Sequence, residues 1–196
     1  MLKRCVLYTM FFFLLAGCAS LSERWEEPLI LDNKIEKGRR QAMKSWSLSG
    51  RLSLRDGKQS KLSLIKWQHN ETEDLWVLSS LIGGTIAEIS HSRGVTYIKE
   101  PKKHHKALGN QELAEAFGFI PPLKHLSYWV RGLADDSEGK QVLVREEYTT
   151  HGFKQHGWLV TLARYAREDG IILPSKVVMS RGDLKIIIVV DKWQTK

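Results

Sequence analysis

The chain has 196 residues, of which 42% are hydrophobic and 27% are charged, and its formal net charge is +8. These proportions exclude a disordered chain, and the length suits a single domain around one core. The basic excess is moderate, and its one dense cluster, residues 99–106, contains no aromatic residue, so no nucleic-acid partner is indicated. That cluster is read either as a solvated loop or as a weak attraction to anionic membrane surfaces.

The first 18 residues carry the clearest signal in the sequence. Lys3 and Arg4 precede an apolar run, residues 5–16. Because this run is shorter than the roughly 20 residues that span a bilayer, residues 1–17 are interpreted as a signal peptide and not as a transmembrane anchor. The tetrad Leu15-Ala16-Gly17-Cys18 resembles a bacterial lipobox.

A lipobox implies that Cys18 receives a diacylglyceryl group, becomes the first residue of the mature chain and is acylated on its amino group. The alternative is an ordinary signal peptide that contains a cysteine. Residues 18–28 are then the lipidated N-terminus and a polar tether, and residues 29–196 form a single domain. Cys5 leaves with the signal peptide, so no intramolecular disulfide can form.

The residue after Cys18 bears on the destination of the chain. It is Ala19, and not the aspartate that resembles an inner-membrane retention signal in many bacteria. By analogy, this favours a protein that is anchored by lipid to the outer membrane and faces the periplasm.

The first part of the domain is expected to contain one helix followed by an antiparallel meander. Leu31, Ile35, Ala42 and Met43 fall at near-helical spacing from about residue 32 onward. Apolar and polar residues then alternate with a period of two, which predicts half-buried strands, and Asp56-Gly57 is a favourable hairpin turn. The predicted strands cover residues 46–55, 61–68, 75–79, 85–90 and 95–99.

Two helices are expected to interrupt the strands. Asn110 precedes Leu113, Phe117 and Ile120 at helical spacing and is the expected cap, and Pro121-Pro122 ends that helix and starts a second one to about residue 130. Strands then resume over residues 142–146, 153–155, 158–165, 176–180 and 184–190. This order predicts an α+β domain in which helices cover a strongly curved antiparallel sheet.

Several local patterns between residues 46 and 193 resemble the LolB family of outer-membrane lipoprotein receptors. They are Gly50-Arg51-Leu52, Trp67-Gln68, Leu81-Ile82-Gly83-Gly84-Thr85, Pro121-Pro122-Leu123, Tyr128-Trp129-Val130, Arg131-Gly132-Leu133, Gly157-Trp158 and Leu173-Pro174. The resemblance implies a LolA/LolB-like open or half β-barrel whose helices enclose an apolar cavity. It further implies a monomeric receptor without cofactors that accepts acylated lipoproteins from a LolA-like periplasmic carrier and inserts them into the outer membrane.

The implied cavity would hold the acyl chains of the transferred lipoprotein. The residues assigned to its lining are Trp46, Leu48, Leu52, Leu64, Trp67, Ile89, Leu113, Phe117, Trp129 and Trp158. Leu113, Phe117 and Ile120 would face inward from a movable lid. The high content of seven tryptophans fits such a cavity, and it equally fits an ordinary aromatic-rich core.

A similar family feature is an exposed apolar side chain on a loop between two early strands, which helps to deliver lipid to the membrane. The matching loop is residues 80–84, where Ile82 is the candidate for the protruding side chain and Leu81 stands where the family often has proline. Proline would stiffen the loop and leucine does not. As the alternative, both side chains fold back into the core.

Other classes of protein find less support in the sequence. No nucleophile-elbow or zinc-protease motif is present, so no enzyme is predicted. His104-His105, or His151 with His156, are incomplete as metal ligands, and no metal site is predicted. Arg181-Gly182-Asp183 fits a plain hairpin turn better than an adhesion motif. A lipid-binding or structural envelope lipoprotein of similar fold stays open as the alternative.

Overall fold

A computed structural model describes residues 34–57, 59–101, 106–135, 142–146 and 150–195. The predicted signal peptide, Cys18, the tether and the first residues of the predicted N-terminal helix lie outside this part of the chain. Within the described ranges, every helix is too short or too polar to cross a membrane.

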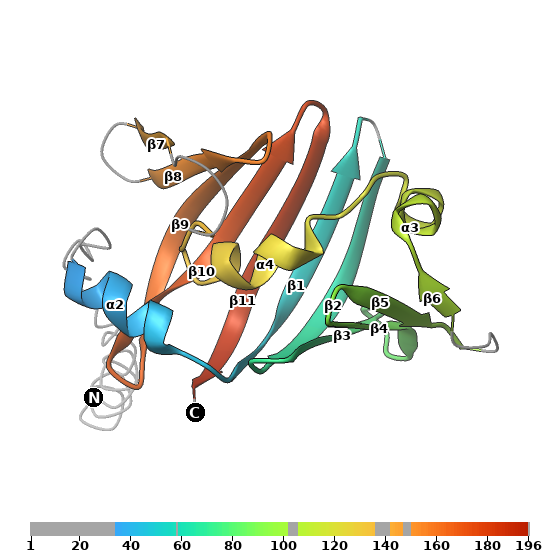
Figure 1. Cartoon of the computed structure of the whole chain (residues 1–196), viewed down its shortest axis with the longest axis horizontal. Helices are drawn as coiled ribbons and strands as arrows, with labels where there is room; N and C mark the ends of the chain where they lie inside the picture. Colours follow the sequence, from blue (N-terminus) through green and yellow to red (C-terminus); the bar gives the residue numbers. More distant parts are fainter. Residues whose placement is uncertain (1–33, 58, 102–105, 136–141, 147–149, 196) are drawn as a thin grey trace, which may run out of the picture.

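The described strands form one antiparallel sheet of eleven strands, with the order β6-β5-β4-β3-β2-β1-β11-β10-β9-β8-β7. β1 and β11, far apart in sequence, pair at its centre, and each half runs outward from that pair as a meander (Figure 1). The strands are β1 (Trp46–Asp56), β2 (Gln59–His69), β3 (Glu73–Ser79), β4 (Thr85–Ser92), β5 (Val95–Lys99), β6 (Lys106–Leu108), β7 (Val142–Glu146), β8 (Thr150–Gln155), β9 (Trp158–Glu168), β10 (Ile171–Arg181) and β11 (Leu184–Thr195).

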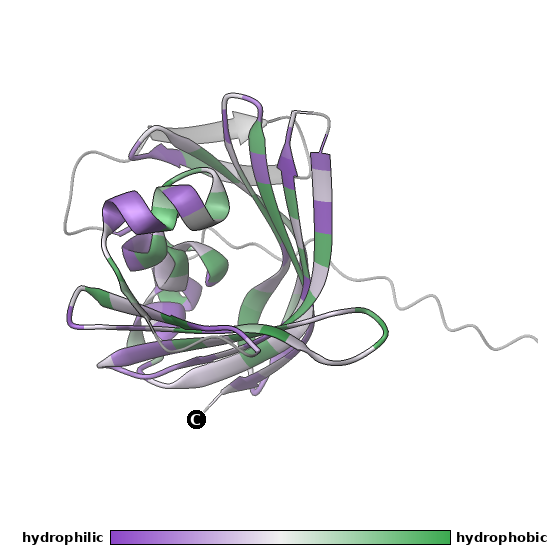
Figure 2. Cartoon of the chain, turned by 90° about the vertical axis from the view of Figure 1, so that its right-hand side faces the viewer, coloured by the Kyte–Doolittle hydropathy of each residue, from purple (hydrophilic) through white to green (hydrophobic). Residues whose placement is uncertain are grey.

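The helices of the described residues lie on one side of this sheet (Figure 1): α2 (Lys34–Ala42), α3 (Asn110–Phe117) and α4 (Leu123–Val130). Seen from the end, the sheet curves around them and stays open, because β6 and β7 are edges that do not pair with each other (Figure 2). The predicted α+β class and the curved, open antiparallel sheet are confirmed.

Two local differences from the sequence prediction concern a short strand and a helix cap. β6 was not predicted, because its three residues are too few to show a period. Asn110 is the first residue of α3 and not its cap. Gly109 takes the cap position, and its N–H donates a hydrogen bond of 3.0 Å to the carboxylate of Glu112.

The buried face of α2 is not the one that the apolar spacing predicts. Ile35 is 64% exposed, whereas Glu36 and Arg40 are buried. A carboxylate oxygen of Glu36 accepts a hydrogen bond from the N–H of Ile172 (3.2 Å), and Arg40 donates to the carbonyl of the same residue (3.4 Å). β11 pairs with β10 only over residues 176–181, so polar side chains of α2 satisfy backbone groups of β10 beyond that register.

Gly50 allows the central strands to approach each other. The register between β1 and β11 shifts between Ser49 and Gly50, which leaves Asp191 as the extra residue of a bulge. A Cβ atom at Gly50 would lie 2.0 Å from the carbonyl oxygen of Val189. A side chain at this position therefore forces the two backbones apart.

Replacement of Gly50 by alanine is expected to lower the free energy of unfolding by about 1–3 kcal/mol, because a rigid backbone must shift to make room. Gly38→Ala is the matched control: nothing lies within 4 Å of its Cβ position in α2, and alanine should stabilise that helix by about 0.5–1 kcal/mol. Urea denaturation measures both. Equal stability of the two variants would contradict the close approach.

Candidate functional site

Tryptophans from adjacent strands cover the inner face of the sheet. Trp46, Trp67, Trp76 and Trp193 come from β1, β2, β3 and β11, and each is less than 5% exposed. The ring centroid of Trp46 lies 4.9 Å from that of Trp67 and 5.3 Å from that of Trp193. Because inward positions recur at every second residue of a strand, the pairing of these four strands brings the rings together.

The polar atoms of this cluster have specific partners that the sequence prediction missed. The indole N–H of Trp67 donates to a carboxylate oxygen of Asp74 (2.7 Å), and Nδ1 of His69 lies 2.7 Å from the same oxygen. The indole N–H of Trp46, by contrast, is buried without a hydrogen-bond partner. Asp74 could have been found as a charged residue at an inward position, two residues before Trp76.

A second group of rings lies beneath α4 and the segment before it. Trp129 of α4 and Trp158 of β9 have centroids 6.3 Å apart, and both are almost fully buried. Phe119 lies 6.3 Å from Trp158 and 6.4 Å from Phe117, the last residue of α3. Contact between the end of α3 and the sheet is therefore made by aromatic rings.

Polar bonds hold α4 in place on this surface. The side-chain carbonyl of Gln155 accepts hydrogen bonds from the indole of Trp129 (2.8 Å) and from the backbone N–H of Asp135 (2.9 Å). Nδ1 of His125 lies 3.0 Å from a carboxylate oxygen of Asp135, and its ring stacks on His156. These partners fix the position of α4 and of the chain that follows it.

Arg131 joins α4 to α2 and is 4% exposed. Its guanidinium donates to the carbonyl oxygens of Arg40 (2.9 Å), Met43 (2.9 Å) and Ser127 (2.8 Å). The first two are carbonyls at the end of α2, where no helical donor is available. Burial lowers the pKa of Arg131, but the ordinary pKa of arginine is so high that the group stays charged.

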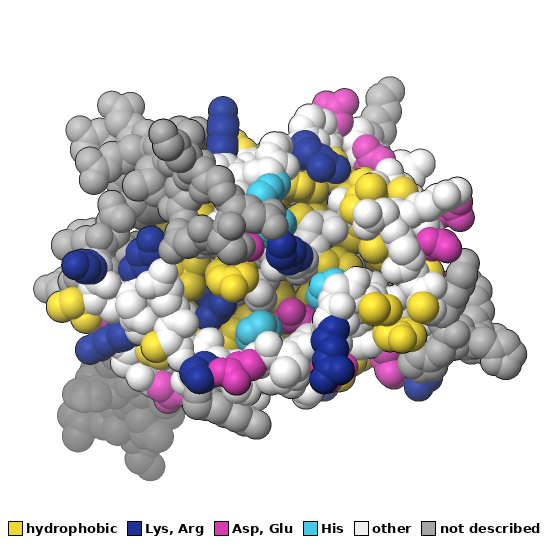
Figure 3. Space-filling view, in the orientation of Figure 1, with side chains coloured by type: hydrophobic (Ala, Val, Ile, Leu, Met, Phe, Trp, Pro, Cys, Tyr) yellow, Lys and Arg dark blue, Asp and Glu magenta, His cyan; other side chains and the backbone are white. Residues whose placement is uncertain are grey.

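Most residues predicted to line the cavity lie on the inner side of the sheet or under the helices. Trp46, Leu48, Trp67, Ile89, Leu113, Trp129 and Trp158 are buried, while Leu52 and Phe117 are half-buried and pack against the core. Apolar side chains are also visible between the helices in the space-filling view (Figure 3). Their role in holding acyl chains stays a prediction.

Two predicted positions are wrong. Leu64 is 38% exposed, and it pairs with Arg51, whose side chain points away from the inner face. The prediction failed because Leu64 and Ile65 are consecutive apolar residues, and the apolar pattern alone does not say which one faces inward. Ile120, placed on the inner face of the lid, is 45% exposed, because α3 ends at Phe117 and the helical spacing does not continue to it.

The loop between β3 and β4 exposes two large apolar side chains. Ile82 is 100% exposed and Leu81 is 56% exposed, so the alternative in which both fold into the core is excluded. The loop is closed by its own backbone: Ser80 N–H donates to the Gly84 carbonyl (3.0 Å), and Gly83 N–H to the Ser80 carbonyl (3.1 Å). Both glycines have positive φ, a conformation that glycine adopts without steric cost.

Among the residues that the structure describes, no group of three His, Cys, Asp or Glu side chains could hold a metal ion. His104 and His105 lie outside the described residues. His156 contacts the ring of His125, as noted above.

An open, curved sheet with an aromatic inner face and a helical cover defines a class of α+β half-barrel proteins. Solved structures share the overall fold: a DUF1329 family protein from Desulfovibrio piger matches with a TM-score of 0.52 at 11% identity, over 83% of this chain and 90% of that one. A putative outer membrane lipoprotein-sorting protein domain from Vibrio parahaemolyticus matches with a TM-score of 0.52 at 12% identity, over 83% and 89%. At these identities, the likeness concerns the fold alone.

The chain belongs to the LolB family, because the family model "Outer membrane lipoprotein LolB" matches residues 44–193. Two relatives are each called outer-membrane lipoprotein LolB. The protein of Chromohalobacter salexigens is 27% identical over 92% of this chain and 86% of its own length. That of Pseudomonas fluorescens is 27% identical over 93% and 92%. The predicted family and the outer-membrane localisation are thereby confirmed.

Arg131→Met is expected to lower the free energy of unfolding by about 2–4 kcal/mol, because buried carbonyls at the end of α2 lose their donors. Arg39→Met is the control: that side chain is half-exposed and donates to the carbonyl of Gly170 in the turn before β10, so its loss should cost about 1 kcal/mol or less. Hydrogen exchange on α2 should accelerate in the first variant only. Unchanged exchange there would show that Arg131 does not hold the helix.

Proposed function

We propose that this protein is an outer-membrane receptor that takes lipoproteins from a periplasmic carrier by binding their acyl chains and passes them into the membrane. The observation that carries the proposal is an aromatic inner face beneath a helical cover, in a chain of the LolB family. Through Cys18, which we expect to be lipidated, the receptor itself stays attached to the bilayer.

The acyl chains would enter between α3 and the sheet. Along this seam, Phe119 contacts the rings of Phe117 and Trp158, whereas α4 is fixed by the hydrogen bonds of Gln155 and by Arg131. The side-chain hydrogen bonds described for α3 are local, from Gly109 to Glu112 and from Gln111 to Glu115. Parting the seam therefore separates mainly apolar groups, and an incoming acyl chain restores the apolar contacts that are lost. The seam therefore opens at a lower free-energy cost than the α4 side.

Transfer would run without ATP, down a gradient of affinity. The inner face must bind the acyl chains more tightly than the carrier does, and the bilayer must hold them more tightly still. Each tenfold step in affinity corresponds to about 1.4 kcal/mol. Burial of two additional methylene groups at about 0.8 kcal/mol each would supply one such step.

The direct test uses the full lipidated chain in vesicles and a soluble carrier loaded with an outer-membrane lipoprotein. Cargo is expected to move to the vesicles only when the chain is present. If cargo stays on a competent carrier while the chain still binds a fluorescent fatty acid, the alternative of a lipid-binding or structural lipoprotein replaces this proposal.

Ile82→Glu is expected to leave folding and cargo acceptance unchanged but to slow the release of cargo into the bilayer about tenfold or more, because a charged tip does not enter an apolar layer. Ile35→Glu is the control, since it makes the same change at an exposed position on α2. Cross-linking counts the cargo that stays on the receptor. Equal release by both variants would remove the proposed role of the loop.

A further inference from the structure

The outer face of the central strands, opposite the helices, is basic. We call the outward side chains of β1, β2, β11 and residues 176–181 of β10 the basic outer face. Register assigns these positions, because residues paired across strands point to the same side. Its cations are Arg51, Arg55, Lys66, Lys176, Lys185 and Lys192.

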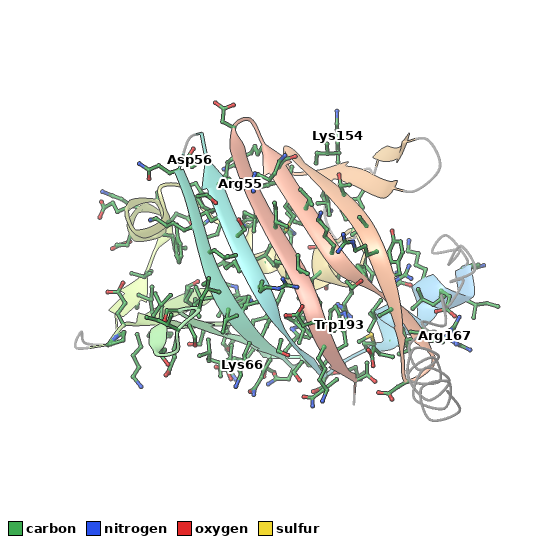
Figure 4. The ribbon with its side chains drawn as sticks, turned by 180° about the vertical axis from the view of Figure 1, so that it is seen from behind. Arg55, Asp56, Lys66, Lys154, Arg167 and Trp193 are labelled. Carbon is green, nitrogen blue, oxygen red and sulfur yellow. The ribbon has the colours of Figure 1, made fainter. Side chains whose placement is uncertain are left out.

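Negative charge on the basic outer face is limited to the bulged residue of β11. Asp191 lies 2.8 Å from the guanidinium of Arg51 and is neutralised by it. The view from behind shows the sheet from this side, with Arg55 and Lys66 labelled (Figure 4). The opposite side presents acidic and basic side chains together (Figure 3). The outward positions of these central strands thus carry a net positive charge on the side away from the helices.

Apolar side chains lie among these cations. One row across four strands joins the apolar residues Leu62, Ile187 and Val178, with Ser53 between the first two. Leu62 is 51% exposed, although a strand that faces water normally places polar residues on its outer side. Cations around a partly exposed apolar row are the composition of a surface that lies at the boundary between lipid headgroups and water.

A hollow on the same face could receive a headgroup. It has a volume of about 210 Å³, and its outward-pointing lining is Ser47, Ser49, Lys66, Gln68, Lys192 and Gln194. Ser49 pairs with Lys66 of β2 on one side and with Lys192 of β11 on the other, so the two cations flank Ser49 on the same side of the sheet. Two ammonium groups beside hydroxyl and amide donors are suited to a phosphate group.

The exposed loop continues this surface. Leu64, on the outer side of β2, pairs with Ser79, the last residue of β3 before the loop. Figure 2 shows the end of the β3–β4 hairpin standing out on the side of the sheet away from the helices, with a hydrophobic tip. The apolar tip and the basic outer face therefore point to the same side of the molecule.

We propose that the basic outer face lies against an anionic phospholipid surface, with a headgroup phosphate between Lys66 and Lys192. The inner face and its helices then turn away from the membrane. This inference rests on the proposed function for the lipid anchor and the loop, and it adds the orientation of the receptor on its membrane. Each cation near such a surface strengthens attachment roughly fivefold, and added salt weakens it.

The test places a spin label on the full lipidated chain in vesicles, since the expected mature chain has no free thiol. Ser53→Cys labels the basic outer face, Gln194→Cys labels the hollow, and Gln111→Cys on α3 is the control. In vesicles containing phosphatidylglycerol, the first two labels should lose access to a water-soluble paramagnetic reagent, and the third should keep it. In phosphatidylcholine alone, all three should be accessible. Equal access of all three labels in both vesicles would overturn the proposal.

Charge reversal provides a second, independent measurement. Lys66→Glu with Lys192→Glu should restore access to the label at Ser53 in anionic vesicles, whereas Lys34→Glu with Arg93→Glu, an equal charge change elsewhere, should not. If both pairs of substitutions restore access equally, attachment depends only on the net charge of the protein and not on this face, and the proposal is overturned.

Cargo acceptance separates this proposal from the one on which it rests. The Lys66/Lys192 variant should still take cargo from the carrier in detergent. Loss of that step would identify the basic outer face as a carrier-docking surface instead. If even the unaltered chain accepts no cargo, the receptor function fails, and the labels still report the orientation.

Discussion

The pairing of β1 with β11 is the constraint on which the rest of the structure depends. It joins the two meanders into one sheet, places Trp46 beside Trp193, and sets which residues of each strand face inward. Gly50 makes this pairing possible, since any side chain there would meet the backbone of β11. The aromatic inner face and the basic outer face are both consequences of that one register.

The cover is held by two different kinds of contact. Arg131 and Gln155 fix α4 through directional hydrogen bonds that are buried from water. Loss of either partner leaves a buried polar group unpaired, which lowers the free energy of unfolding. Phe117 and Phe119 hold the end of α3 by apolar contact, which another apolar group can replace. Within the same helical cover, α4 can thus stay in place while an apolar ligand replaces the contacts of α3.

Sequence alone predicted the strands well, because a period of two is easily seen in residues such as Trp46, Leu48 and Leu52. It failed where the pattern was ambiguous or polar. Leu64 and Ile65 gave no indication of which one faces inward, and α2 packs through Glu36 and Arg40 in place of its apolar residues. The role of Arg131 depends on partners distant in sequence, which no local pattern contains, whereas Asp74 was missed although Trp67 and His69 lie close to it in sequence.

The central strand pair also determines when the protein can fold. Ser47 of β1 bonds to Gln194 of β11, 147 residues further along the chain. Contacts of such long sequence separation form late, because the entropy of closing the loop is lost before they form. Until β11 has emerged on the far side of the inner membrane, β1 is paired on one side only, by β2, and the sheet has an open edge there. Secretion of this chain therefore requires that the nascent β-strands be kept from aggregating until translocation reaches the last of them.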